Sequence, residues 1–166
     1  MGIIRSYKRE FGSVDWRVSL MTGVLSCIFT GIVYLLAGGA VAYRRLWGEC
    51  ALARPIVWLG CLQGLALLSG IALGIYCGQC GWCVKGKRDG IFRWLLGFFT
   101  MLLWIALFLK GCELLSIVVF VCSIIAMVSA IEWFLRESLL SATVLVVGVL
   151  WMMSSFFLNL RIILWN

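Results

Sequence analysis

The sequence predicts an all-α integral membrane protein, a compact bundle of five, alternatively four, transmembrane helices joined by short loops. Of its 166 residues, 64% are hydrophobic, which leaves too few polar side chains to cover a compact soluble domain. The apolar residues form runs of about 20 residues or more, the length that a helix needs to cross roughly 30 Å of hydrocarbon. These runs are continuous rather than alternating, so helices are expected instead of the strands of a membrane barrel.

The polar segments divide the chain into four regions. Residues 1–17 form an N-terminal tail, 18–76 a helical hairpin of spans one and two, 77–90 a cysteine-rich basic loop, and 91–166 a block of three helices. Span one is expected over residues 18–43. Span two is expected to begin at Pro55, because the first helical turn tolerates the missing N–H of proline, and to end near Cys77.

The apolar run 91–135 is too long for one span and is cut at Lys110, Gly111 and Glu113. Spans three to five are therefore expected over residues 91–109, 113–134 and 139–160, with a second turn at 136–138. A count of four would follow if one of these tight hairpins is re-entrant or one helix lies on the membrane surface. Because span three is rich in aromatic residues and poor in small ones, we expect it to face lipid or a partner more than the bundle centre.

Small and polar residues recur along the spans and are candidates for helix packing or a polar lining. Small side chains let helix backbones approach closely, and buried amides or hydroxyls bond across helices in an apolar medium. Gln63, the amide within span two, is expected to hydrogen-bond to a neighbouring helix, with contact to a substrate as the alternative. The candidates are Gly23, Cys27, Gly31, Gly60, Gln63, Gly64, Ser123, Gly148, Ser155 and Asn159, with Gly70 and Gly74 as a second close-approach pair.

The net charge of +7 is carried by Lys and Arg residues at the ends of the apolar runs. In a membrane protein this pattern indicates topology signals and phospholipid contacts rather than nucleic-acid binding. The tail and the central loop carry more cations than the linkers on the opposite side, so the N-terminus is expected on the cytoplasmic or matrix side. The span-end charges, among them Arg93 and Glu132, are expected to reach toward the interface or to pair with each other.

Two segments are candidates for lipid attachment. Gly2 begins an M-G-x-x-x-[ST] pattern typical of N-myristoylation, although the tail could instead form an amphipathic segment on the membrane surface. Cys77, Cys80 and Cys83 lie beside a span and a basic cluster, as palmitoylated cysteines do. A soft-metal site, a redox pair and free thiols are the alternatives for these three residues.

Cys50 and Cys112 fall in two linkers on the side opposite the N-terminus. They are a candidate disulfide if that side is oxidising and their Cα atoms lie within about 7 Å. The segment 46–50, with Cys61, resembles a fragment of the tryptophan and double-cysteine signature of the claudin-type tetraspan proteins. That family places both cysteines in a long extracellular loop, whereas the linker here is short and Cys61 falls within span two, so the resemblance implies no function.

The sequence favours a non-catalytic role. It contains no histidine, no carboxylate at the centre of an apolar run and no complete catalytic motif, so a lipid-modifying enzyme ranks last. No cofactor, metal, nucleic acid or small-molecule substrate is expected. We expect an accessory, structural or assembly subunit of a larger membrane complex, whose partners are other integral membrane proteins and phospholipids. The alternative is a small channel or transporter formed by homo-oligomerisation, lined by Gln63, Ser123, Ser155 and Asn159.

Overall fold

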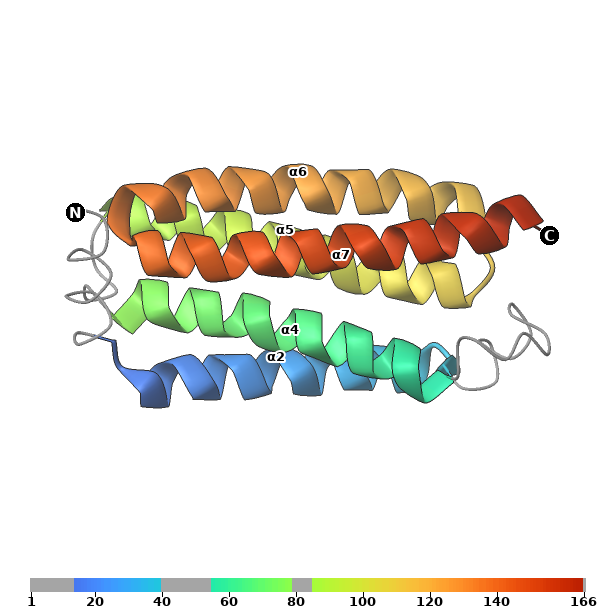
Figure 1. The fold of residues 1–166 in the computed structure, drawn as a ribbon, viewed down its shortest axis with the longest axis horizontal. Coiled ribbons are helices and arrows are strands. Elements are labelled where there is room, and N and C mark those ends of the chain that lie inside the picture. Colours follow the sequence, from blue (N-terminus) through green and yellow to red (C-terminus); the bar gives the residue numbers. More distant parts are fainter. Residues whose placement is uncertain (1–13, 40–54, 79–84, 166) are drawn as a thin grey trace.

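The computed structural model describes residues 14–39, 55–78 and 85–165, and every element in these ranges is helical. The prediction of an all-helical chain with five long helices is confirmed for this part of the chain. The helices are α2 (Trp16–Leu36), α4 (Pro55–Gly78), α5 (Lys85–Leu109), α6 (Glu113–Glu137) and α7 (Leu139–Trp165) (Figure 1).

The helices form two antiparallel pairs, α2 with α4 and α5 with α6 (Figure 1). Helix α7 packs on both α4 and α6 and so joins the pairs. The backbones of α4 and α5 hardly touch, and large side chains fill the space between these helices. Helix α2 lies at the edge of the bundle and packs mainly on α4.

Four helices are long and apolar enough to cross a membrane. The qualifying stretches among the described residues are Trp16–Leu36, Leu59–Gly78, Lys87–Leu109 and Glu113–Glu137. Within α7, the described apolar stretch is Leu139–Ser154. The coarse prediction of several membrane-compatible helices therefore agrees with the structure.

Local capping explains both ends of α2. The Asp15 carboxylate accepts hydrogen bonds from the N–H groups of Arg17 and Val18, two of the donors that the first turn of a helix leaves unpaired. Gly38, with φ of +76°, then ends the helix in the left-handed conformation that glycine adopts without a Cβ clash. Helix α2 therefore ends at Leu36, before the bound at residue 43 that hydropathy predicted.

Two tight turns separate the last three helices where the sequence predicts them. Gly111, with φ of +78°, occupies a Schellman motif in which its own N–H bonds to the Phe108 carbonyl and that of Cys112 to the Leu107 carbonyl. The extended residue Ser138 alone separates α6 from α7, and its hydroxyl accepts a bond from the N–H of Ser141. The predicted break at 136–138 is therefore narrower than expected.

The predicted loop at 77–90 is also shorter than its composition suggests. Cys77 and Gly78 form the end of α4, and the basic segment from Lys85 onward is already the first turn of α5. Arg88 and Asp89 project outward from this first turn, whereas Lys87 turns back toward the end of α4.

The expectation that span three faces away from the bundle was wrong. Trp94, Phe98, Trp104 and Phe108 of α5 are all buried in the core, whereas Phe92 and Phe99 are exposed. Trp94 extends to the Ser69 carbonyl of α4, and Trp104 packs against Phe120 of α6, so these rings fill the space between α5 and its neighbours. On α6, Ser116, Ser123 and Ala130 recur every seven residues and form a buried stripe, in which Ser123 is a predicted packing residue.

Candidate functional site

Side-chain donors of α2 bond to the backbone of α4. The Thr22 hydroxyl donates to the Gly70 carbonyl at 2.7 Å, and the Cys27 thiol lies 3.4 Å from the Gln63 carbonyl. These carbonyls are available because an oxygen engaged in its own helix still has a second lone pair. The polar residues of α2 thus stabilise the α2–α4 pair.

Donors from α5 and α7 also reach carbonyls of α4. The Trp94 indole N–H donates to the Ser69 carbonyl at 3.0 Å, and the Ser141 hydroxyl donates to the Ala72 carbonyl at 2.5 Å. Both side chains are buried, so each bond satisfies a donor that has no access to solvent. Helix α4 is therefore the acceptor for polar contacts from three neighbouring helices.

The predicted glycine pairs of α4 differ in their surroundings. A Cβ added at Gly74 would lie 2.3 Å from the Ser19 Cα, and one at Gly70 would lie 2.6 Å from the Thr22 carbonyl oxygen. A Cβ added at Gly60 or Gly64 would meet nothing within 4 Å. Close approach of α2 and α4 therefore requires glycine at the later pair and not at the earlier one.

The other predicted packing glycines lie at three different kinds of contact. A Cβ at Gly23 would lie 3.0 Å from side-chain atoms of both Leu67 and Ile71, which is a tight contact with α4. One at Gly31 would lie 3.2 Å from the side-chain nitrogen of Gln63. Gly148 of α7 faces α4 at ordinary contact distance, with the Leu68 Cβ at 3.7 Å.

Gln63 and Ser123 lie in different helix interfaces. The half-buried Gln63 amide is next to Gly31, between α2 and α4. The buried Ser123 hydroxyl donates to the Gly97 carbonyl at 2.9 Å, between α6 and α5. Ser155 and Asn159 belong to α7, but their side chains lie outside the described part of the structure. Of the predicted polar pore lining, Gln63 therefore contacts α2 and Ser123 contacts α5.

Lys87 is buried, a placement that the sequence analysis missed. Its ammonium group donates to the Tyr76 carbonyl at 3.1 Å and lies 5.3 Å from the centroid of the Tyr76 ring. That ring stacks on Phe134 of α6 with centroids 4.1 Å apart. A cation at the C-terminal end of a helix interacts favourably with the helix dipole, so Lys87 stabilises the end of α4. The sequence feature that could have predicted this contact is a lysine that follows shortly after the end of a helix.

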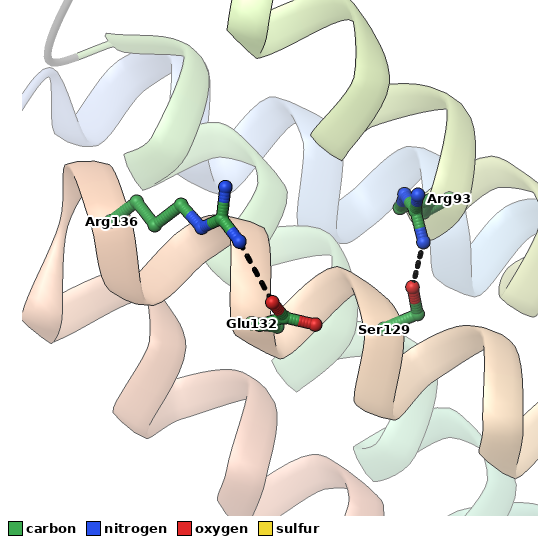
Figure 2. A network of polar contacts seen from close by, with 4 residues as sticks. All are labelled: Arg93, Ser129, Glu132 and Arg136. Atoms are coloured by element: carbon green, nitrogen blue, oxygen red, sulfur yellow. Dashed lines mark hydrogen bonds and ion pairs between the residues drawn. The ribbon is translucent and has the colours of Figure 1, made fainter.

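An exposed cluster of two arginines, one tryptophan and their partners lies on α5 and α6. Arg136 forms an ion pair with Glu132, one turn earlier on α6, at 2.8 Å. Arg93 of α5 donates a hydrogen bond to the Ser129 hydroxyl (Figure 2). The guanidinium carbons of Arg93 and Arg136 lie 5.7 and 4.8 Å from the centroid of the Trp133 ring. We call these five residues the arginine–tryptophan cluster.

Glu132 does not pair with another of the predicted span-end charges such as Arg93. It pairs with Arg136, which the sequence analysis assigned to a turn. The i,i+4 spacing of Glu132 and Arg136 would have indicated this pair from the sequence alone. No sequence pattern predicts that Arg93 of another helix meets the same tryptophan. The cluster lies near the end of the bundle where α2, α5 and α7 begin (Figure 1).

The lipidation and disulfide candidates lie mostly outside the described residues. Gly2, Cys50, Cys80 and Cys83 fall in this category, so acylation of these residues and a Cys50–Cys112 bond remain predictions. Cys112 is exposed at the start of α6. Cys77 is buried, with 3% of its surface exposed, and belongs to the core. Within the described ranges, no three Cys, Asp or Glu side chains lie close enough together to hold a metal ion.

Comparison with known proteins finds no match to a family model, to a curated protein sequence or to a solved structure.

Proposed function

We propose that the chain is an integral membrane protein with five spans, and that the end of the bundle where α5 begins faces the cytoplasm or matrix. Helix α7 has 27 residues, which correspond to about 40 Å at 1.5 Å per residue, enough to cross a bilayer. Among the residues that the structure describes, Arg17, Lys85, Lys87, Arg88, Arg93 and Arg136 belong to the proposed inner end, whereas Lys110 and Arg161 belong to the opposite end. Such an excess of cations marks the cytoplasmic side of a span.

The span count is tested by the sides on which the two termini lie. An odd number of spans places the termini on opposite sides of the membrane. In sealed vesicles, epitope tags at the N- and C-terminus should therefore show opposite sensitivity to added protease. If the two tags were equally sensitive to the protease, the termini would lie on the same side, and the count of five spans would be replaced by four.

We further propose that the protein is a non-catalytic accessory, structural or assembly subunit of a larger membrane complex. The observation that carries this proposal is the broad apolar face of the edge helix α2, which packs mainly on α4. The large apolar side chains exposed on α2 are Trp16, Leu20, Met21, Val24, Leu25, Ile28, Phe29, Ile32, Leu35 and Leu36. An edge helix with such a face can add a further transmembrane helix without rearranging the bundle.

The internal polar contacts support the same proposal. Thr22, Ser123 and Ser141 each direct their hydroxyl to a backbone carbonyl of a neighbouring helix. Hydroxyls used in this way hold helices together, since an unpaired polar group is costly in an apolar medium. The described polar groups therefore favour a structural role over a catalytic one.

The test is the mass and composition of the particle extracted in a mild detergent. A large particle with stoichiometric partners supports an accessory subunit. The double variant Phe29→Ala, Ile32→Ala should then release the partners. The matched variant Ile125→Ala, Val128→Ala, on the exposed face of α6, should retain them. Retention of all partners by the α2 variant would show that this face does not carry assembly.

The channel or transporter alternative is distinguished by the same preparation. A small homo-oligomer without other subunits, which produces a flux in reconstituted vesicles, would replace the accessory-subunit proposal. Gln63→Leu then separates the two roles of this amide. Loss of flux with an intact oligomer would assign Gln63 to a pore, whereas a loosened assembly without flux would assign it to packing.

A further inference from the structure

Arg93 occupies an unusual position on the lateral surface of α5. The apolar residues 94–109 that follow it extend about 24 Å at 1.5 Å per residue, somewhat less than the roughly 30 Å of a hydrocarbon core. With Lys110 at one membrane surface, Arg93 therefore lies near the boundary between hydrocarbon and headgroups on the other side. Its exposed apolar neighbours Phe92 and Leu96, and Val128 on α6, indicate that this surface faces lipid.

The contacts of Arg93 leave its charge uncompensated. Its partners are the Ser129 hydroxyl and the face of Trp133, and neither group is charged. Among the described residues, no carboxylate lies within ion-pairing distance of Arg93, and Glu132 pairs with Arg136 instead. A guanidinium at the edge of hydrocarbon gains most from an anion that lies at the same depth.

We propose that the arginine–tryptophan cluster binds the phosphate of an anionic phospholipid headgroup on the outer surface of α5 and α6. Arg93 donates to the phosphate oxygens, and the Ser129 hydroxyl and the Trp133 ring hold the guanidinium in position. Arg136, over the same ring, adds positive potential despite its pairing with Glu132. Arginine suits this role because its planar fork donates two parallel hydrogen bonds to a phosphate.

The choice of a lipid over a soluble phosphate follows from the surroundings. The cluster is flanked by exposed apolar side chains, including Phe92 and Leu135, which would contact the acyl chains of the same molecule. Tryptophan prefers the headgroup level of a bilayer, so Trp133 places the cluster at the depth of the phosphates. This inference rests on the proposed membrane insertion of the chain.

The experiment compares lipid binding by the full chain and its variants in detergent, measured by native mass spectrometry. The added lipid is phosphatidylglycerol, with phosphatidylcholine as the zwitterionic reference. The wild type should retain phosphatidylglycerol preferentially. Arg93→Gln should lower the affinity for phosphatidylglycerol about tenfold, as expected for the loss of a charge-assisted bond. Arg93→Lys keeps the charge but lacks the paired N–H donors of the planar guanidinium, so it should give an intermediate loss of affinity for phosphatidylglycerol.

Arg88→Gln is the matched control, because it removes the same charge from an exposed position on the first turn of α5. Its effect should stay within about twofold, as expected for a solvated surface charge. Unchanged binding by Arg93→Gln would overturn the site, as would an equal loss in Arg88→Gln. If inorganic phosphate displaced bound phosphatidylglycerol as effectively as added lipid does, the assignment of the site to a lipid would be overturned. Circular dichroism verifies that the variants remain helical.

Co-flotation of the wild type with vesicles of pure phosphatidylcholine separates the two proposals. A chain that floats but shows no preference for phosphatidylglycerol overturns the site and leaves membrane insertion intact. A chain that does not float overturns membrane insertion and, with it, the site.

Discussion

Thr22 shows how one hydroxyl can stabilise a helix pair. Its oxygen lies 3.0 Å from the Val18 and Ser19 carbonyls of its own helix and 2.7 Å from the Gly70 carbonyl of α4. The contact with α4 is the shortest of the three, and it is possible because Gly70 lets the backbones approach. Bonds of this kind in membrane proteins contribute about 0.6 kcal/mol on average and at most about 1.7 kcal/mol.

Thr22→Val should therefore lower the free energy of unfolding by about 0.6 to 1.7 kcal/mol, because valine keeps the volume and removes the donor. Thr100→Val is the control, since the Thr100 hydroxyl bonds to Leu96 and Gly97 of its own helix. Both variants are compared by denaturant unfolding in detergent. Equal losses in the two variants would show that the bond to Gly70 adds nothing to stability.

Gly74 and Gly64 form a matched pair on the same helix. Gly74→Ala should destabilise the protein by about 1–3 kcal/mol, because the new Cβ would overlap the Ser19 backbone and push α2 away. Gly64→Ala should be neutral or stabilising by up to about 1 kcal/mol, because it adds helix propensity in open space. Thermal unfolding in detergent measures both effects. A destabilising Gly64→Ala would indicate that α4 approaches another helix at this earlier glycine.

At the level of the helices, α5 has two different aromatic faces. Trp104 is buried and makes an edge-on contact with Phe120 of α6, with ring centroids 4.9 Å apart. Phe120 in turn stacks on Phe156 of α7 at 4.1 Å. These rings connect the last three helices. Phe99 lies on the opposite, exposed face of α5 and takes no part in this connection.

Trp104→Ala should lower the free energy of unfolding by about 3–5 kcal/mol, since it leaves a cavity against Phe120 that the neighbouring helices cannot close. Phe99→Ala should change it by less than about 0.5 kcal/mol, because lipid or detergent replaces the ring. Denaturant unfolding in detergent compares the two variants. A loss from Phe99→Ala as large as that from Trp104→Ala would mean that a partner covers the outer face of α5.

For the whole molecule, α7 is the helix that connects the two pairs. It packs on α4 and α6, while α4 and α5 make few direct backbone contacts. Ser141 adds a buried hydrogen bond from α7 to the Ala72 carbonyl of α4. The two hairpins are therefore expected to depend on α7 for their association.

This dependence can be measured with a chain divided after residue 82. Co-expressed pieces 1–82 and 83–166 should co-purify, because α7 brings its contacts with α4. Pieces 1–82 and 83–138, which lack α7, should co-purify much less. If both combinations of pieces were recovered equally, α7 would not be needed for the association of the two hairpins. The side-chain contacts of Trp94 and Lys87 with α4 would then account for it.

The sequence by itself determined the helical class, the number of long helices and the positions of the last two breaks between them. Gly111 and Ser138 interrupt apolar runs at residues where local backbone chemistry ends a helix, and Ser116, Ser123 and Ala130 mark one buried stripe. Only the tertiary structure decided which apolar faces meet. It buried the Trp104 face of α5 and placed Gly74, but not Gly64, against α2. The physical reason is that lipid and protein both accept large apolar side chains. Hydropathy therefore does not distinguish a face that contacts lipid from one that contacts protein, and the choice depends on the shape of the neighbouring helix.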